Sequence, residues 1–196
     1  MHQRNRIMKI FDHFQHINLS NDQHQAVEKL HAFLENDERV FILQGYAGSG
    51  KTTLLKGIVE YLESLEKKYQ LMAPTGRAAK VINQKTGFES TTIHKGIYSF
   101  DELLEIKQSN DEKDVSFLYQ YKIRNNIDLH RAVFIIDEAS MVSDVLSEGE
   151  FFRFGSGNLL QDLIAFTRIQ DTSIQTKIIF IGDPAQLPPI GMNFSP

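Results

Sequence analysis

The chain has 196 residues, of which 41% are hydrophobic and 23% charged, as is typical of a globular protein of one domain or of one domain with a small insertion. It lacks cysteine, which excludes disulfides, thiolate metal sites and cysteine nucleophiles and fits the reducing cytoplasm where we expect it to reside. Its net charge of −4 argues against a dedicated nucleic-acid-binding module. Its apolar runs are too short for a membrane span or a secretory signal, so no membrane contact is expected.

The first half of the chain predicts helices that alternate with strands. Residues 1–18 are polar with scattered aromatic side chains, and we treat them as an N-terminal extension. Ser20 and Gln23 have the spacing of a capping box, and apolar residues follow at helical intervals, so a helix is expected to end near Asn36. The apolar run 40–44 predicts a buried strand. Further expected elements are a helix from about 50 to 65, a strand over 69–73 and a helix over 75–84 that Gly87 caps.

The second half continues this alternation after an interruption. Residues 100–128 are charged, and aromatic residues alternate there with polar ones around an exposed turn, so we predict a small hairpin-like insertion. Apolar runs predict strands over 132–136 and 177–181, with a helix over 158–168 between them. Such alternation is typical of an α/β fold with a mostly parallel sheet and flanking helices, here one domain over 19–196.

A phosphate-binding loop lies between the predicted strand over 40–44 and the helix after it. The segment GYAGSGKT matches the pattern G-x-x-x-x-G-K-[ST], whose glycines let successive N–H groups face phosphate oxygens at a helix start. Lys51 is placed to reach the β- and γ-phosphates, and the Thr52 hydroxyl to hold Mg²⁺. We therefore favour a nucleotide site over an unliganded glycine-rich turn, formed by Gly45, Ala47, Gly48, Ser49, Gly50, Lys51, Thr52 and Thr53.

Two acidic residues end the strand predicted over 132–136. A carboxylate at the C-terminal end of a parallel strand faces the same crevice as the phosphate loop. We expect Asp137 to contact Mg²⁺, through its water shell, and Glu138 to orient and deprotonate the attacking water. The alternative is a strand that ends in a solvated acidic turn.

With these motifs the chain resembles the N-terminal motor domain of superfamily 1 DNA helicases, and in particular the RecD-like and Dda-like branch, superfamily 1B. The resemblance runs from about Leu19 to Gly191. Its segments occur in the order of the family's Q motif and motifs I, Ia, Ib, II and III: LSNDQ, GYAGSGKTT, APTGRAAKVI, TTIHKGI, IIDEASM and IGDPAQLPPIG.

The resemblance implies a RecA-like P-loop NTPase domain that uses ATP and Mg²⁺ and moves along single-stranded DNA, 5′ to 3′. It implies that Gln23 reads the adenine edge, that Gln186 is a catalytic sensor of the γ-phosphate alongside Lys51, Asp137 and Glu138, and that Asp183 helps to arrange the pocket. The insertion occupies the place of a subdomain that carries a strand-separating pin. Pro74, Thr75, Thr92 and His94 are implied to lie along the DNA path.

The residues themselves predict this DNA strip less firmly. The backbone around Thr75 and the Arg77 cation can meet a phosphate at a helix N-terminus, but without the resemblance an ordinary capped helix is the favoured explanation. His94 is alternatively a partly buried histidine bonded to backbone. Phe151, Phe152 and Phe154 around Arg153 have the composition of a base-stacking surface, although core residues under a loop are the favoured reading, and His13 and His16 are taken as surface residues.

The family's motor has two RecA-like domains, and the second supplies an arginine finger worth about 10³ to 10⁵ in turnover. The chain stops at Pro196, so we expect a fragment that binds Mg-nucleotide modestly, hydrolyses ATP very slowly and does not unwind DNA. That second domain and subunits of a nuclease complex are its expected partners. Two alternatives stay open: another P-loop ATPase, such as a clamp loader or small-molecule kinase, and a nucleotide-gated binding module without turnover.

Overall fold

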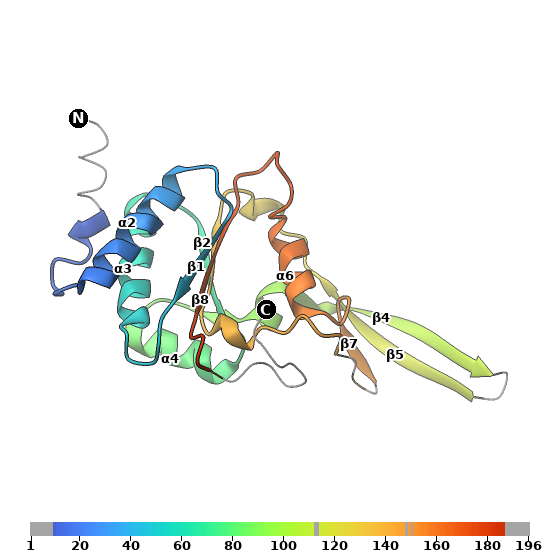
Figure 1. Ribbon diagram of the computed structural model, residues 1–196. Helices are drawn as coiled ribbons and strands as arrows, with labels where there is room; N and C mark the ends of the chain where they lie inside the picture. Colours follow the sequence, from blue (N-terminus) through green and yellow to red (C-terminus); the bar gives the residue numbers. More distant parts are fainter. Residues whose placement is uncertain (1–9, 112–113, 148, 150, 187–196) are drawn as a thin grey trace.

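The computed structural model describes residues 10–111, 114–147, 149 and 151–186. Its centre is a sheet of five parallel strands in the order β1–β8–β6–β2–β3. Helices cover both faces of this sheet (Figure 1). The strands are β1 (Val40–Gln44), β2 (Tyr69–Ala73), β3 (Thr91–Thr92), β6 (Val133–Ile136) and β8 (Lys177–Gly182).

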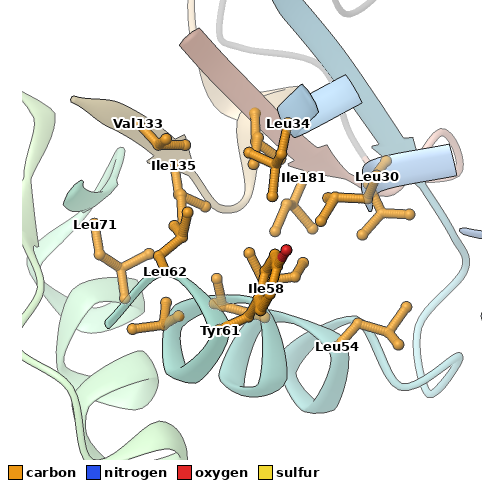
Figure 2. Packing of buried hydrophobic residues seen from close by; sticks show 14 of the residues in the cluster. Leu30, Leu34, Leu54, Ile58, Tyr61, Leu62, Leu71, Val133, Ile135 and Ile181 are labelled. Carbon is orange, nitrogen blue, oxygen red and sulfur yellow. The ribbon is translucent and has the colours of Figure 1, made fainter. Parts of the chain in front are cut away.

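One face of the sheet packs on α2 (Asn21–Glu35), α3 (Lys51–Ser64) and α4 (Gly76–Thr86). Leu54, Ile58 and Leu62 recur every fourth residue of α3, so one side of the helix is apolar and buries itself against the strands (Figure 2). Each such side chain contributes roughly 1.5–3 kcal/mol when fully buried. This packing fixes α3, and with it the loop at its N-terminus, over the sheet.

Part of the predicted N-terminal extension belongs to the same core. Ile10 and Phe14 are buried, and the Phe14 ring lies against Gly57 of α3, where a Cβ atom would come within 2.3 Å of the ring. Only glycine therefore admits the ring at this point. Residues 1–9 lie outside the described residues.

The other face packs on α5 (Ile93–Ile97) and α6 (Leu159–Thr167). The Tyr98 hydroxyl donates a 2.6 Å hydrogen bond to the buried Asp162 carboxylate, which also accepts from the Ser156 backbone N–H. These bonds tie the start of a second sheet to α6. Two short 3₁₀ turns, η1 (Ile127–Leu129) and η2 (Ala139–Met141), flank β6.

The second sheet corresponds to the predicted insertion. Its hairpin, β4 (Tyr98–Asp111) and β5 (Asp114–Ile123), is antiparallel and extends away from the central sheet (Figure 1). A third strand, β7 (Phe152–Phe154), pairs with β5 in parallel. Aromatic rings stack between β5 and β7: the ring centroids of Tyr121 and Phe154 are 4.9 Å apart.

The predicted α/β class, the parallel sheet and the hairpin are confirmed, and the capping box at Ser20 and the Gly87 cap are both present. One expectation about burial was wrong. β1 is an edge strand. Its Phe41 packs toward α2, whereas Val40 and Ile42, on the opposite face, are 47% and 63% exposed. The short elements β3, α5 and β7 were not foreseen as elements, since they are too brief to carry a periodic pattern.

The contact between Phe14 and Gly57 gives a stability prediction. Phe14→Ala is expected to lower the free energy of unfolding by about 3–5 kcal/mol, because it leaves a cavity against α3. Gly57→Ala is also destabilising, but in the double variant the losses are less than additive, since the ring that clashes is gone. Urea unfolding measures all three. His16→Ala, an exposed change in the same segment, is the control, and equal stability of Phe14→Ala and His16→Ala contradicts the packing.

Candidate nucleotide-binding site

The predicted site residues follow three strands that end at one edge of the central sheet. The loop 45–50 follows β1, Asp137 follows β6, and Asp183 follows β8. Because the strands are parallel, their C-terminal ends meet, and the Gly45 N–H donates to the Gly182 carbonyl at 3.1 Å. The fold therefore gathers residues that the sequence separates by more than one hundred positions.

The loop itself turns through two glycines with positive φ, Gly48 at 79° and Gly50 at 85°. The Ser49 N–H donates to the Tyr46 carbonyl at 3.1 Å, which closes the turn before α3 begins at Lys51. A Cβ atom on Gly50 would lie 2.5 Å from the Gln23 amide nitrogen. Glycine is thus required at position 50 both by backbone angle and by its neighbour.

The Lys51 ammonium group is held close to the loop. It donates to the carbonyl oxygens of Gly45 and Tyr46, the latter at 3.0 Å, and lies 3.7 Å from the Asp183 carboxylate. The Asp183 side chain is only 3% exposed, so water screens this ion pair weakly. A cation is therefore fixed at the mouth of the turn.

Gln23 joins the N-terminus of α2 to the glycine-rich loop. Its amide nitrogen donates to the Ser49 carbonyl at 2.8 Å, and its amide oxygen accepts from the Ser20 N–H at 2.9 Å. Both heteroatoms of the amide are thus bonded within the chain. The capping box predicted from sequence is present, but its second partner, the loop, was not anticipated.

The two acids after β6 have different surroundings. Burial raises the pKa of the Asp137 carboxyl to about 6, although the N–H donated by Glu138 and the charge of Lys51 act in the opposite direction. Glu138 adopts the left-handed region, with φ 53° and ψ 38°, which turns the chain sharply into η2. Its Oε2 atom is buried and has no hydrogen-bond partner among the described residues.

The remaining predicted nucleotide residues lie around this cluster. Thr52 is half-buried in the first turn of α3, and Ala47 and Thr53 are exposed. Gln186 is exposed, and its amide oxygen accepts a 3.0 Å hydrogen bond from Ser140, a residue of η2 that sequence reasoning missed. The last residues of the predicted motif III, 187–191, lie outside the described residues.

Four residues of the predicted DNA strip lie together at the ends of β2 and β3. Ala73 and Thr92 are register partners, and a Cβ on Gly76 would lie 3.9 Å from the Thr92 side chain. The hydroxyls of Thr75 and Thr92 cap α4 and α5, accepting from backbone N–H groups at 3.2 and 3.1 Å. The capped-helix alternative is thus observed, while Thr75 and Arg77 remain exposed and Pro74 is half-buried.

His94, in the first turn of α5, packs its ring on aromatic side chains of the second sheet. Its ring is 5.0 Å from that of Phe154 and 5.6 Å from that of Tyr98, and burial lowers its pKa against the influence of Asp162. The favoured interpretation of the FFRF segment as core was wrong for two of its rings. Phe151 and Phe152 are 58% and 47% exposed, because β7 adds to the outer side of the hairpin.

Other classes of site find no support among the described residues. Within them, no group of three or more histidine, aspartate and glutamate side chains is arranged to hold a metal ion on its own. His16 is exposed, and the half-buried His13 packs on Tyr61. In that same part of the chain, no helix is both long enough and apolar enough to cross a membrane.

Residues 18–148 match the family model described as an AAA domain. The chain belongs to this AAA domain family. It is 31% identical over 183 residues to the RecBCD enzyme subunit RecD of Buchnera aphidicola (subspecies Schizaphis graminum), an alignment that covers 88% of this chain and 27% of that protein. It is 26% identical to the ATP-dependent RecD2 DNA helicase of Deinococcus radiodurans, over 88% of this chain and 18% of that protein.

A solved structure shares the fold of this AAA domain. Pif1 of a Bacteroides species, crystallised with ADP-AlF4, superposes with a TM-score of 0.52 at 24% identity, over 90% of this chain and 35% of the other. These relatives bear out the resemblance to superfamily 1B: the chain corresponds to one segment of RecD- and Pif1-type helicases. It spans well under half the length of the relatives that it matches.

The raised pKa of Asp137 gives a prediction for pH. The folded chain keeps this proton up to about pH 6 and the unfolded chain releases it near its ordinary pKa of 3.8, so stability falls as pH rises between these values. Asp137→Asn removes the buried charge and is expected to stabilise the metal-free chain by about 3 kcal/mol at about pH 8, and hardly at all at about pH 4. Urea unfolding at both pH values, with the exposed Asp144→Asn as control, measures this. A gain that does not depend on pH contradicts it.

Proposed function

We propose that the chain is the nucleotide-binding half of an ATP-driven motor that acts on single-stranded DNA. The observation that carries this proposal is the convergence of the Lys51 ammonium, two buried aspartates and a loop of backbone N–H groups at the carboxyl edge of one parallel sheet. Such an edge favours anions beside a hard divalent cation. The description of the D. radiodurans relative as ATP-dependent supports ATP as the nucleotide.

Phosphate oxygens take the place of the carbonyl groups that now hold Lys51. The ammonium group needs only to leave the carbonyls of Gly45 and Tyr46 to donate to β- and γ-phosphates, while Asp183 keeps it near the loop. Because the loop turn and the start of α3 are already formed, little backbone ordering remains to be done on binding. The base is positioned near Gln23, whose second amide hydrogen is available to an adenine acceptor.

The donor set fits Mg²⁺, which prefers oxygen ligands and keeps part of its water shell. Thr52 and Asp137 are the residues that hold it, and when bound it neutralises charge on the transferred phosphoryl group. The buried, unpartnered Oε2 of Glu138 is suited to accept a proton from the attacking water, since it lacks a competing partner among the described residues. Gln186 donates to the γ-phosphate.

Single-stranded DNA follows the ends of β2 and β3, where Thr75 and Thr92 begin α4 and α5 and Arg77 is exposed in the first turn of α4. The helix N-termini at Thr75 and Thr92 present backbone N–H groups, and Arg77 supplies a cation for a phosphate. We further propose that a second RecA-like domain completes turnover and sets 5′-to-3′ movement, so that the chain alone hydrolyses ATP slowly and does not unwind DNA.

Loss of the cation tests the nucleotide site. Lys51→Ala is expected to weaken binding of Mg-ATP by about 10- to 100-fold, because it removes charge-assisted hydrogen bonds to phosphate. Lys56→Ala is the matched control, since Lys56 pairs with Glu60 on the exposed side of the same helix. Titration calorimetry measures both. The nucleotide assignment is wrong if the two variants bind alike.

Loss of the proposed base separates an ATPase from a binding module without turnover. Glu138→Gln is expected to keep the affinity for Mg-ATP and to lower single-turnover hydrolysis by about 10²- to 10⁴-fold. If the chain is instead a binding module, the parent chain hydrolyses ATP no faster than the Lys51→Ala variant. Glu138→Gln then leaves the rate of hydrolysis unchanged.

Salt dependence tests the DNA strip. Arg77→Ala is expected to weaken binding of a single-stranded oligonucleotide and to reduce the slope of log K against log salt by about 0.7, the value for one phosphate contact. Lys56→Ala changes the net charge equally but lies on another helix, so it is expected to leave both quantities unchanged. Fluorescence anisotropy across a salt series gives the slopes. Equal slopes for the two variants remove Arg77 from the DNA path.

A further inference from the structure

Ser140 lies where the acidic turn meets the end of β8. The left-handed Glu138 turns the chain into η2, and η2 packs on the C-terminal end of β8: a Cβ on Gly182 would lie 3.5 Å from the Ser140 backbone nitrogen. Ser140 is 6% exposed, and its place is fixed by this packing and by the 3₁₀ bond from the Met141 N–H to the Glu138 carbonyl. Its hydroxyl therefore occupies a defined position between the catalytic turn and the residues after β8.

The partner of that hydroxyl is less constrained. Gln186 is exposed, and its backbone is held by a 3.1 Å bond from its N–H to the Asp183 carbonyl. Its side chain has three rotatable bonds, so an unrestrained amide would sample several orientations. The Ser140 hydroxyl donates to the Gln186 amide oxygen at 3.0 Å, which restrains the otherwise exposed amide.

The direction of this hydrogen bond decides which end of the amide is available. Phosphate oxygens only accept hydrogen bonds, so only the amide nitrogen of Gln186 can meet a phosphate. When Ser140 binds the oxygen, the NH₂ group is left as the outward donor. We propose that Ser140 is a positioning residue that sets the Gln186 amide for recognition of the γ-phosphate, and thereby makes the site prefer a triphosphate to a diphosphate. This inference rests on the proposed nucleotide site.

The test uses binding, so it does not depend on turnover. Titration calorimetry measures the affinities for Mg-ADP and for the Mg²⁺ complex of a non-hydrolysable ATP analogue. Ser140→Ala is expected to reduce the preference for the triphosphate about tenfold while the affinity for ADP stays unchanged. Ser140→Thr keeps a hydroxyl and is expected to keep the preference. The unchanged affinity for ADP serves as an internal control for folding.

Variants of Gln186 show whether Ser140 acts through it. Gln186→Ala and Gln186→Glu are each expected to lose the preference, since neither supplies an N–H donor, and adding Ser140→Ala to Gln186→Ala is expected to cost nothing more. The inference is overturned if Ser140→Ala keeps the parent's preference, lowers both affinities equally, or adds to Gln186→Ala. A parent that binds both nucleotides without preference also overturns it, whereas a parent that binds neither overturns the proposed function itself.

Discussion

The Lys51 ammonium group is the charge around which the rest of the site is arranged. Buried in part and satisfied by two carbonyl oxygens of its own loop, it is stabilised in place by the shielded carboxylate of Asp183. An anion that arrives there exchanges these carbonyls for its own oxygens, so the affinity it gains is the difference between two sets of hydrogen bonds. Preorganisation, rather than the number of contacts, is what the fold contributes.

Three features of the fold keep that cation in register. β1 and β8 set the separation between the loop and Asp183, α3 is anchored by its apolar side in the core, and Gln23 braces the loop from α2 (Figure 2). The brace has a consequence for nucleotide recognition. Because both heteroatoms of the Gln23 amide are bonded within the chain, contact with a base uses the second amide hydrogen or replaces an existing bond.

Sequence reasoning succeeded where a local rule was sufficient. The capping box of α2, the strand over 69–73 and the glycine-rich turn before α3 each follow from spacing within a few residues. It failed where tertiary neighbours decide. The exposure of Ile42 depends on which strand lies at the edge of the sheet, and the bond between Ser140 and Gln186 joins residues 46 positions apart with no pattern that links them. β7 has three residues, too few for a periodic signal, and it forms only because the hairpin offers it an edge.

The edge position of β1 leaves two apolar side chains exposed on the strand that leads into the glycine-rich loop. The strand that leads into the loop is bonded to a single neighbour, β8, and turns Val40 and Ile42 toward solvent. A partner surface that covers these two side chains would contact β1, the strand that leads into the glycine-rich loop. If that contact raises the affinity for nucleotide, thermodynamic linkage requires nucleotide to raise the affinity of the contact by the same factor. Under that condition, the edge formed by β1 among the described strands would couple association to nucleotide binding.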